Sequence, residues 1–144
     1  MNNSSRFLNG GEHNRGLILI VDDFEDVREM YAQFLNTEGF KVVLASDGEE
    51  AVDKAVRLRP DVVVMDLRLP GINGWEAAQR IRQNDSNKGT GVIIMTAFAN
   101  AAPAVIRNGC DAFLGKPCAP DRLLKEITTL VDRKRQGVSA AQLP

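Results

Sequence analysis

Short apolar runs recur along the chain and predict the strands of a β-sheet. Runs such as residues 17–21 and 62–65 contain β-branched residues and no polar alternation. This pattern is typical of strands that are buried on both faces of a parallel sheet. The pattern as a whole predicts strands over residues 17–21, 41–45, 62–65, 92–95 and 111–115.

The segments between these runs carry apolar residues at helical spacing. Asp47 or Ser46 can cap one such helix at its start, and Pro60 ends it. Because crossovers between parallel strands are almost always right-handed, the alternation predicts an α/β fold, a doubly wound five-stranded parallel sheet of the flavodoxin-like (βα)5 type. Helices are predicted over residues 25–38, 49–59, 74–84 and 99–108, and from Asp121 onward.

Length and composition indicate one globular domain. The chain has 144 residues, of which 44% are hydrophobic, and a formal net charge of −1. This balance gives no overall field that would favour direct DNA binding or an acidic membrane surface. No apolar run approaches a membrane span and the N-terminus lacks the apolar core of a signal peptide, so we expect a cytoplasmic protein. The predicted domain covers residues 17–136, between flexible tails at 1–16 and 137–144.

Two cysteines, Cys110 and Cys118, are the only ones in the chain. They are too few for a disulfide framework and have no metal-ligand partners at useful spacing. We expect two free thiols that are small, apolar or half-buried.

Polar residues follow four of the predicted strands directly. Asp22 and Asp23 follow the first, Asp66 the third, Thr96 the fourth and Lys116 the fifth. The carboxyl ends of parallel strands share one edge of the sheet, so these side chains should converge. Two carboxylates 4 Å apart repel by about 4 kcal/mol at an effective dielectric of 20, so positive charge must offset them. Lys116 can supply one charge, and Mg²⁺, which prefers oxygen ligands, can supply two.

This set of residues suits phosphoryl transfer. Asp66 would be the nucleophile that attacks phosphorus. Mg²⁺ on Asp23 and Asp66 would neutralise the phosphoryl oxygens, with Asp22 orienting a metal-bound water. Lys116 and the Thr96 hydroxyl would hold the remaining phosphoryl oxygens.

Four motifs, taken in order and together, resemble the receiver domain of the two-component response regulators. The resemblance runs from about Leu17 to Arg133. The motifs are Val21-Asp22-Asp23, Asp66-Leu67-Arg68-Leu69-Pro70-Gly71-Ile72-Asn73-Gly74, Met95-Thr96-Ala97 and Phe113-Leu114-Gly115-Lys116-Pro117.

The resemblance implies a phosphoacceptor switch that catalyses only its own phosphorylation and slow dephosphorylation, and is not an enzyme toward other substrates. It implies phosphorylation on Asp66, with Mg²⁺ held by Asp22, Asp23, Asp66 and the backbone carbonyl of Arg68. A histidine kinase or a histidine phosphotransfer protein would be the donor. No output domain follows residues 131–136, so we expect a stand-alone regulator that acts through contact with a downstream protein.

The resemblance also implies a conformational switch and a cis bond between Lys116 and Pro117. Thr96 would move toward the phosphoryl group and Phe113 would turn inward. Phe113 could equally be an ordinary core residue at a strand end, and it lacks the hydroxyl of the tyrosine that is commoner there.

Two departures affect what carries over from the family. The segment between Thr96 and Lys116 is shorter than usual, so the partner-binding surface is the least transferable part. Arg68 and Phe98 occupy sites that tune water access to the phosphoryl group in this family.

Trp75 is expected to be a partly buried packing residue.

Two other functions fit these residues less well than the switch. A Mg²⁺-dependent phosphatase with an aspartyl-phosphate intermediate would want a second carboxylate two residues after the nucleophile, where Arg68 stands. A flavodoxin-like cofactor binder would need a phosphate-binding loop after the first strand, where Asp22 and Asp23 would repel phosphate without a metal. A degenerate receiver is disfavoured because no site residue is missing.

Overall fold

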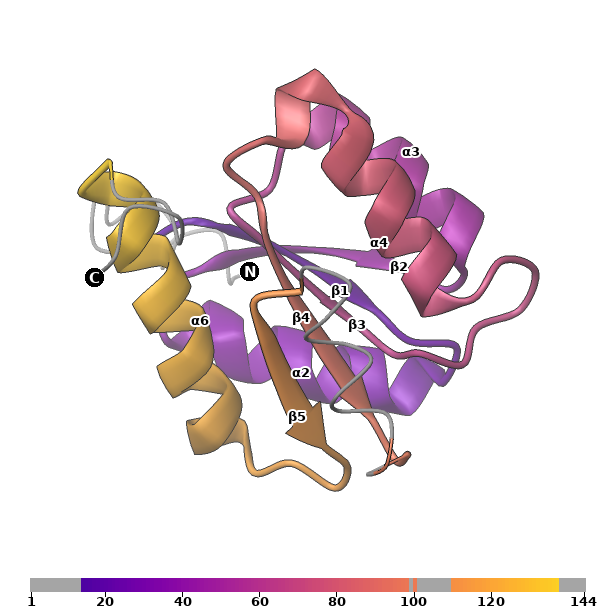
Figure 1. Ribbon diagram of the computed structural model, residues 1–144. Coiled ribbons are helices and arrows are strands. Elements are labelled where there is room, and N and C mark those ends of the chain that lie inside the picture. Colours follow the sequence, from indigo (N-terminus) through magenta and orange to yellow (C-terminus); the bar gives the residue numbers. More distant parts are fainter. Residues whose placement is uncertain (1–13, 99, 101–109, 138–144) are drawn as a thin grey trace, which may run out of the picture.

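Five parallel strands form one sheet with helices on both faces in the computed structural model (Figure 1), which describes residues 14–98, 100 and 110–137. The strand order is β2-β1-β3-β4-β5. The predicted α/β fold class is therefore confirmed. The strands are β1 (Leu17–Val21), β2 (Lys41–Ala45), β3 (Val62–Met65), β4 (Gly91–Thr96) and β5 (Ala112–Gly115).

The described helices are α2 (Glu25–Thr37), α3 (Gly48–Leu58), α4 (Gly74–Gln83) and α6 (Pro120–Arg135). The predicted helix over 99–108 lies outside the described residues, apart from residue 100, and so does most of each predicted tail. Within the described part of the chain, no helix combines the length and the apolar character that crossing a membrane requires.

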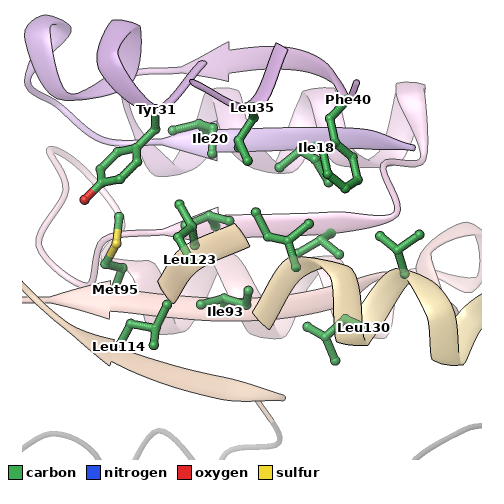
Figure 2. Packing of buried hydrophobic residues seen from close by; sticks show 14 residues of the cluster. Ile18, Ile20, Tyr31, Leu35, Phe40, Ile93, Met95, Leu114, Leu123 and Leu130 are labelled. Atoms are coloured by element: carbon green, nitrogen blue, oxygen red, sulfur yellow. The ribbon is translucent and has the colours of Figure 1, made fainter. Parts of the chain in front are cut away.

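The sheet separates two buried clusters, as expected for strands with no polar alternation. One cluster places α2 and α6 against one face, with Leu35 and Ile127 among its members (Figure 2). The other places α3 and α4 against the opposite face, through Ala55 and Ile81. Strand β3 serves both, because alternate side chains of a strand point to opposite faces.

Several boundaries differ from the predicted ones for identifiable reasons. Between the predicted helix over 74–84 and the predicted strand over 92–95, the structure has a short 3₁₀ helix, η2 (Asp85–Asn87), and Gly91 already belongs to β4. Helix α6 begins at Pro120 rather than Asp121, since proline's fixed φ suits the first helical position. Both thiols are free, Cys110 buried and Cys118 half-buried, as expected.

Of the two proposed caps of α3, the structure uses Asp47. Its carboxylate accepts a hydrogen bond of 2.8 Å from the backbone N–H of Glu50. The Glu50 carboxylate in turn accepts one of 2.8 Å from the backbone N–H of Ser46. This backbone contact and the neighbouring Lys54 lower the pKa of Glu50 despite partial burial. Hydrogen bonds in both directions between the β2–α3 turn and the first turn of α3 thus fix the start of this helix.

Replacing the cap should weaken the fold measurably. Asp47→Ala is expected to lower the free energy of unfolding by about 1 kcal/mol, because the Glu50 N–H loses its acceptor. Asp53→Ala on the same helix is the control: its exposed ion pair with Arg57 is worth about 0.5 kcal/mol or less. Urea unfolding followed by circular dichroism compares the two. Equal losses would contradict the capping role.

Candidate functional site

Three of the predicted site residues meet at the carboxyl edge of the sheet. Asp22 follows β1, Asp66 follows β3 and Lys116 follows β5. Lys116 Nζ lies 2.5 Å from Asp22 Oδ2 and 2.7 Å from Asp66 Oδ2. Both aspartates are buried, and the lysine is mostly so. One ammonium group therefore bridges two carboxylates that come from non-neighbouring parts of the sequence.

The electrostatics of this bridge favour its charged form. Burial lowers the pKa of Lys116, but the hydrogen bonds to Asp22 and Asp66 outweigh burial, and its pKa is raised above the ordinary lysine value. The remaining carboxylate oxygens are held by backbone N–H groups. Asp22 Oδ1 accepts from Phe24 at 2.9 Å, and Asp66 Oδ1 accepts from Arg68 at 3.1 Å. The two carboxylates still outnumber the single ammonium group.

Asp23 lies beside this bridge but belongs to an open pocket. It is exposed, and it lines a cavity of about 650 Å³ together with residues of the loop that follows Asp66. The Arg68 guanidinium stacks over the Phe98 ring in the same pocket, with 4.3 Å between its carbon and the ring centroid. Trp75 also lines the pocket and is partly buried. A ligand in this pocket would meet Asp23, Arg68 and Phe98.

The donor set fits a hard divalent cation. Within the described residues, no three Asp, Glu, His or Cys side chains are close enough to form a metal site on their own. Mg²⁺ does not require this, because it commonly takes one or two carboxylates and completes its shell with water, carbonyl or phosphate oxygens. The candidates Asp22, Asp23, Asp66 and the Arg68 carbonyl offer oxygen only.

Thr96 and Phe113 lie on the two strands next to the bridge. Thr96 ends β4 and is buried, and its carbonyl accepts a hydrogen bond of 2.9 Å from the Lys116 N–H. Its hydroxyl accepts from the Phe98 N–H at 3.4 Å. Phe113 is partly buried on β5 and packs with the α3 and α4 cluster. The Lys116–Pro117 peptide bond is cis.

The loop after Asp66 is held by close backbone packing at its end. The Gly74 N–H donates to the Leu67 carbonyl at 2.8 Å. A Cβ on Gly74 would lie 2.3 Å from the Asp66 carbonyl oxygen, so no larger residue fits without movement. Similarly, a Cβ on Gly48 would lie 2.7 Å from the Ile72 carbonyl oxygen. No sequence pattern predicts these contacts.

Helix α2 supplies two contacts that the sequence patterns did not reveal. Arg28 Nη1 donates to the Asp22 carbonyl at 2.6 Å. The Tyr31 hydroxyl donates to the Cys118 carbonyl at 2.8 Å. Helical spacing predicts the helix that carries Tyr31 but not the partner of its hydroxyl. Its hydroxyl was the available signal, since buried phenols usually find a partner.

Comparison with known proteins places this geometry in context. The model of the response regulator receiver domain matches residues 18–128. The DNA-binding response regulator MtrA of Mycobacterium leprae is 32% identical over 121 residues, which cover 83% of this chain and 52% of that protein. Response regulator Rre1 of Synechocystis is 33% identical over 126 residues, covering 85% of this chain and 54% of that protein. The chain thus spans about half the length of these curated relatives.

Solved structures give the same picture. A response regulator receiver domain protein (CheY-like) from Methanospirillum hungatei superposes with a TM-score of 0.78 at 27% identity, covering 84% of this chain and 97% of that one. The receiver domain of a sensor histidine kinase from Pseudomonas aeruginosa gives a TM-score of 0.75 at 28% identity, covering 81% and 98%. That structure has a magnesium ion coordinated in its active site cleft.

The packing of Gly74 against Asp66 can be tested by substitution. Gly74→Ala is expected to destabilise the protein by about 1–3 kcal/mol, the usual cost of overpacking, although helix propensity alone would favour alanine. Gly89→Ala is the control, because its Cβ would meet only the flexible end of Lys134, at 3.3 Å. Urea unfolding measures both. A Gly74→Ala protein as stable as the wild type would refute the close-approach argument.

Proposed function

Since the chain belongs to the response regulator receiver domain family, we propose that it accepts a phosphoryl group on Asp66 and so switches its contacts with other proteins. The observation that carries this proposal is the contact of the Lys116 ammonium with both Asp22 and Asp66, at the carboxyl ends of β1, β3 and β5. It gives the acceptor carboxylate a cationic neighbour in a buried setting, where electrostatic stabilisation is strongest.

The proposed step is a transfer between two residues. A carboxylate oxygen of Asp66 attacks the phosphorus of a phosphohistidine, a P–O bond forms, the P–N bond breaks, and the imidazole leaves. Lys116 is within reach of the incoming phosphoryl oxygens because its ammonium already contacts the acceptor at 2.7 Å. Asp66 is held in place meanwhile by the Arg68 N–H.

Mg²⁺ is the cofactor that the donor oxygens suit best. Asp22, Asp23 and Asp66 would hold it, together with the Arg68 carbonyl. When bound, the ion offsets the negative charge of the phosphoryl oxygens. The receiver domain with magnesium in its active site cleft supports this assignment.

The switch would pass through β4 and β5. Thr96 is the proposed sensor, because its hydroxyl lies at the end of β4 and its carbonyl is bonded to Lys116. Phe113 is the proposed second element, on the neighbouring strand and only partly buried. Phosphorylation would bias a two-state equilibrium of these residues.

The proposed partners are proteins. A histidine kinase or histidine phosphotransfer protein would donate the phosphoryl group in the cytoplasm, and a downstream protein would receive the signal. The relative MtrA is named a DNA-binding response regulator, and Rre1 a response regulator. The near-neutral net charge of the present chain does not favour direct contact with DNA. The phosphatase alternative gains no support, since Arg68 stands where its second carboxylate would be needed and the guanidinium stacks on Phe98.

Phosphorylation should occur once per chain and at Asp66. With acetyl phosphate and Mg²⁺, intact-mass measurement is expected to show one added phosphoryl group that is stable to acid and released by alkali. Asp66→Asn should lose it completely. Asp53→Asn removes an exposed carboxylate on α3 and serves as the charge-matched control. Labelling that survives in Asp66→Asn would refute the assignment.

Metal dependence should follow Asp23. Asp23→Asn is expected to raise the Mg²⁺ concentration at half-saturation by about tenfold or more, since loss of groups that hold or orient a metal typically costs that much. Trp75 fluorescence reports the titration, because this residue lines the pocket. Glu25→Gln, an exposed charge-matched change at the start of α2, should leave the midpoint unaltered. A similar shift of the Mg²⁺ midpoint in both variants would show a general charge effect instead. Removal of Mg²⁺ with EDTA should also abolish phosphorylation by acetyl phosphate.

A further inference from the structure

Helix α2 reaches both partners of the Asp22–Lys116 ion pair. Arg28 donates to the carbonyl of Asp22, and Tyr31, one turn further along, donates to the carbonyl of Cys118. Cys118 lies two residues after Lys116, in the turn that leaves β5. One helix therefore contacts the backbone of both segments whose side chains form the ion pair at 2.5 Å.

The Tyr31 ring is a core residue, but its hydroxyl is not needed for packing. The residue is only 3% exposed and belongs to the cluster that α2 and α6 form over the sheet. Figure 2 shows its oxygen at the margin of this apolar cluster, away from Leu35 and Phe40. Phenylalanine would fill the same space without the cost of burying a hydroxyl, which is offset here by the bond to Cys118.

The hydroxyl remains a donor under all ordinary conditions. Burial, followed by the influence of Cys118, raises the pKa of Tyr31 above the usual phenol value. The hydrogen bond to the Cys118 carbonyl thus joins α2 to the turn in a single protonation state, and its length of 2.8 Å is ordinary for an O–H donor.

The turn that carries Lys116 has an anchor on each side. Before it, the Lys116 N–H bonds to the Thr96 carbonyl at 2.9 Å, which fixes the turn to β4. After it, the Cys118 carbonyl bonds to Tyr31. The long lysine side chain is flexible, so its ammonium group can stay on two carboxylates only if the backbone from which it extends is held.

We propose that Tyr31 is a positioning residue for Lys116, acting through the Cys118 carbonyl. This inference rests on the proposed function, in which Lys116 holds the phosphoryl oxygens. Without the hydroxyl, the turn loosens and the ammonium spends less time at Asp22 and Asp66. Phosphoryl transfer then slows. Mg²⁺ binding becomes tighter, because Lys116 and the cation compete for the same carboxylates.

The test is Tyr31→Phe, which keeps the ring and removes only the donor. The phosphorylation rate with acetyl phosphate at saturating Mg²⁺ is expected to fall about three- to tenfold, the range that one lost hydrogen bond corresponds to. The Mg²⁺ midpoint, read from Trp75 fluorescence, is expected to fall by about a factor of two, as removal of a partly screened competing charge implies. If Tyr31 had only a structural role, its loss would not both slow phosphorylation and tighten Mg²⁺ binding.

Thr90→Val is the matched control. The Thr90 hydroxyl is also buried: it donates to the Pro60 carbonyl at 3.0 Å and accepts from Asn87 Nδ2 at 3.2 Å. Thr90 precedes β4, at the end of the strands opposite to Lys116. Thr90→Val should cost at least as much stability as Tyr31→Phe and change neither readout. The inference is overturned if Tyr31→Phe leaves the rate unchanged, if Thr90→Val slows it equally, or if the Mg²⁺ midpoint of Tyr31→Phe does not fall.

The two proposals fail separately. If the wild-type chain acquires no phosphoryl group on Asp66, the proposed function is refuted. The Mg²⁺ midpoint alone then decides the inference: a lower midpoint in Tyr31→Phe supports the positioning role, and an equal or higher one overturns it.

Discussion

A single ammonium group shared by two buried carboxylates is the constraint on which the site depends. Asp22 and Asp66 would repel each other strongly at this depth, and Lys116 makes their proximity tolerable by contacting both. The balance is incomplete, since two negative charges face one positive charge. Asp23, exposed in the adjoining pocket, adds a third acid. This deficit of positive charge is the physical basis for the Mg²⁺ site proposed above.

The sheet topology brings these three residues together. Strand β1 has β2 and β3 as its neighbours, and β4 separates β3 from β5. Asp22 and Asp66 therefore follow adjacent strands, whereas Lys116 must reach across the end of β4, where Thr96 stands. The side chain of Thr96 at this strand end is small and buried.

The sequence predicts which strand ends form the site but not the backbone and side-chain contacts that hold them in place. Apolar runs followed by Asp22, Asp66 and Lys116 predict a common edge, because all strands of a parallel sheet end on the same side. The order of the strands is not predicted by these patterns. The Tyr31–Cys118 contact joins residues 87 positions apart through one side-chain atom and one backbone carbonyl, and no periodicity encodes such a pairing. The sequence does not predict the close approach of Gly74 to the Asp66 carbonyl either, since a glycine at this place in the chain is also compatible with a simple turn.

The hydrogen bonds of Thr96 bear on its proposed role as the sensor of phosphorylation. Its hydroxyl accepts from the Phe98 N–H at 3.4 Å, a long contact that costs little free energy to break. Its carbonyl, by contrast, accepts a hydrogen bond of 2.9 Å from the Lys116 N–H, one residue past the last pair of β4 and β5, Thr96 and Gly115. A new acceptor beside Asp66 could therefore attract the hydroxyl without disturbing the sheet. In the proposed switch, the backbone that holds Lys116 would stay in place while the Thr96 side chain turns toward the phosphoryl group.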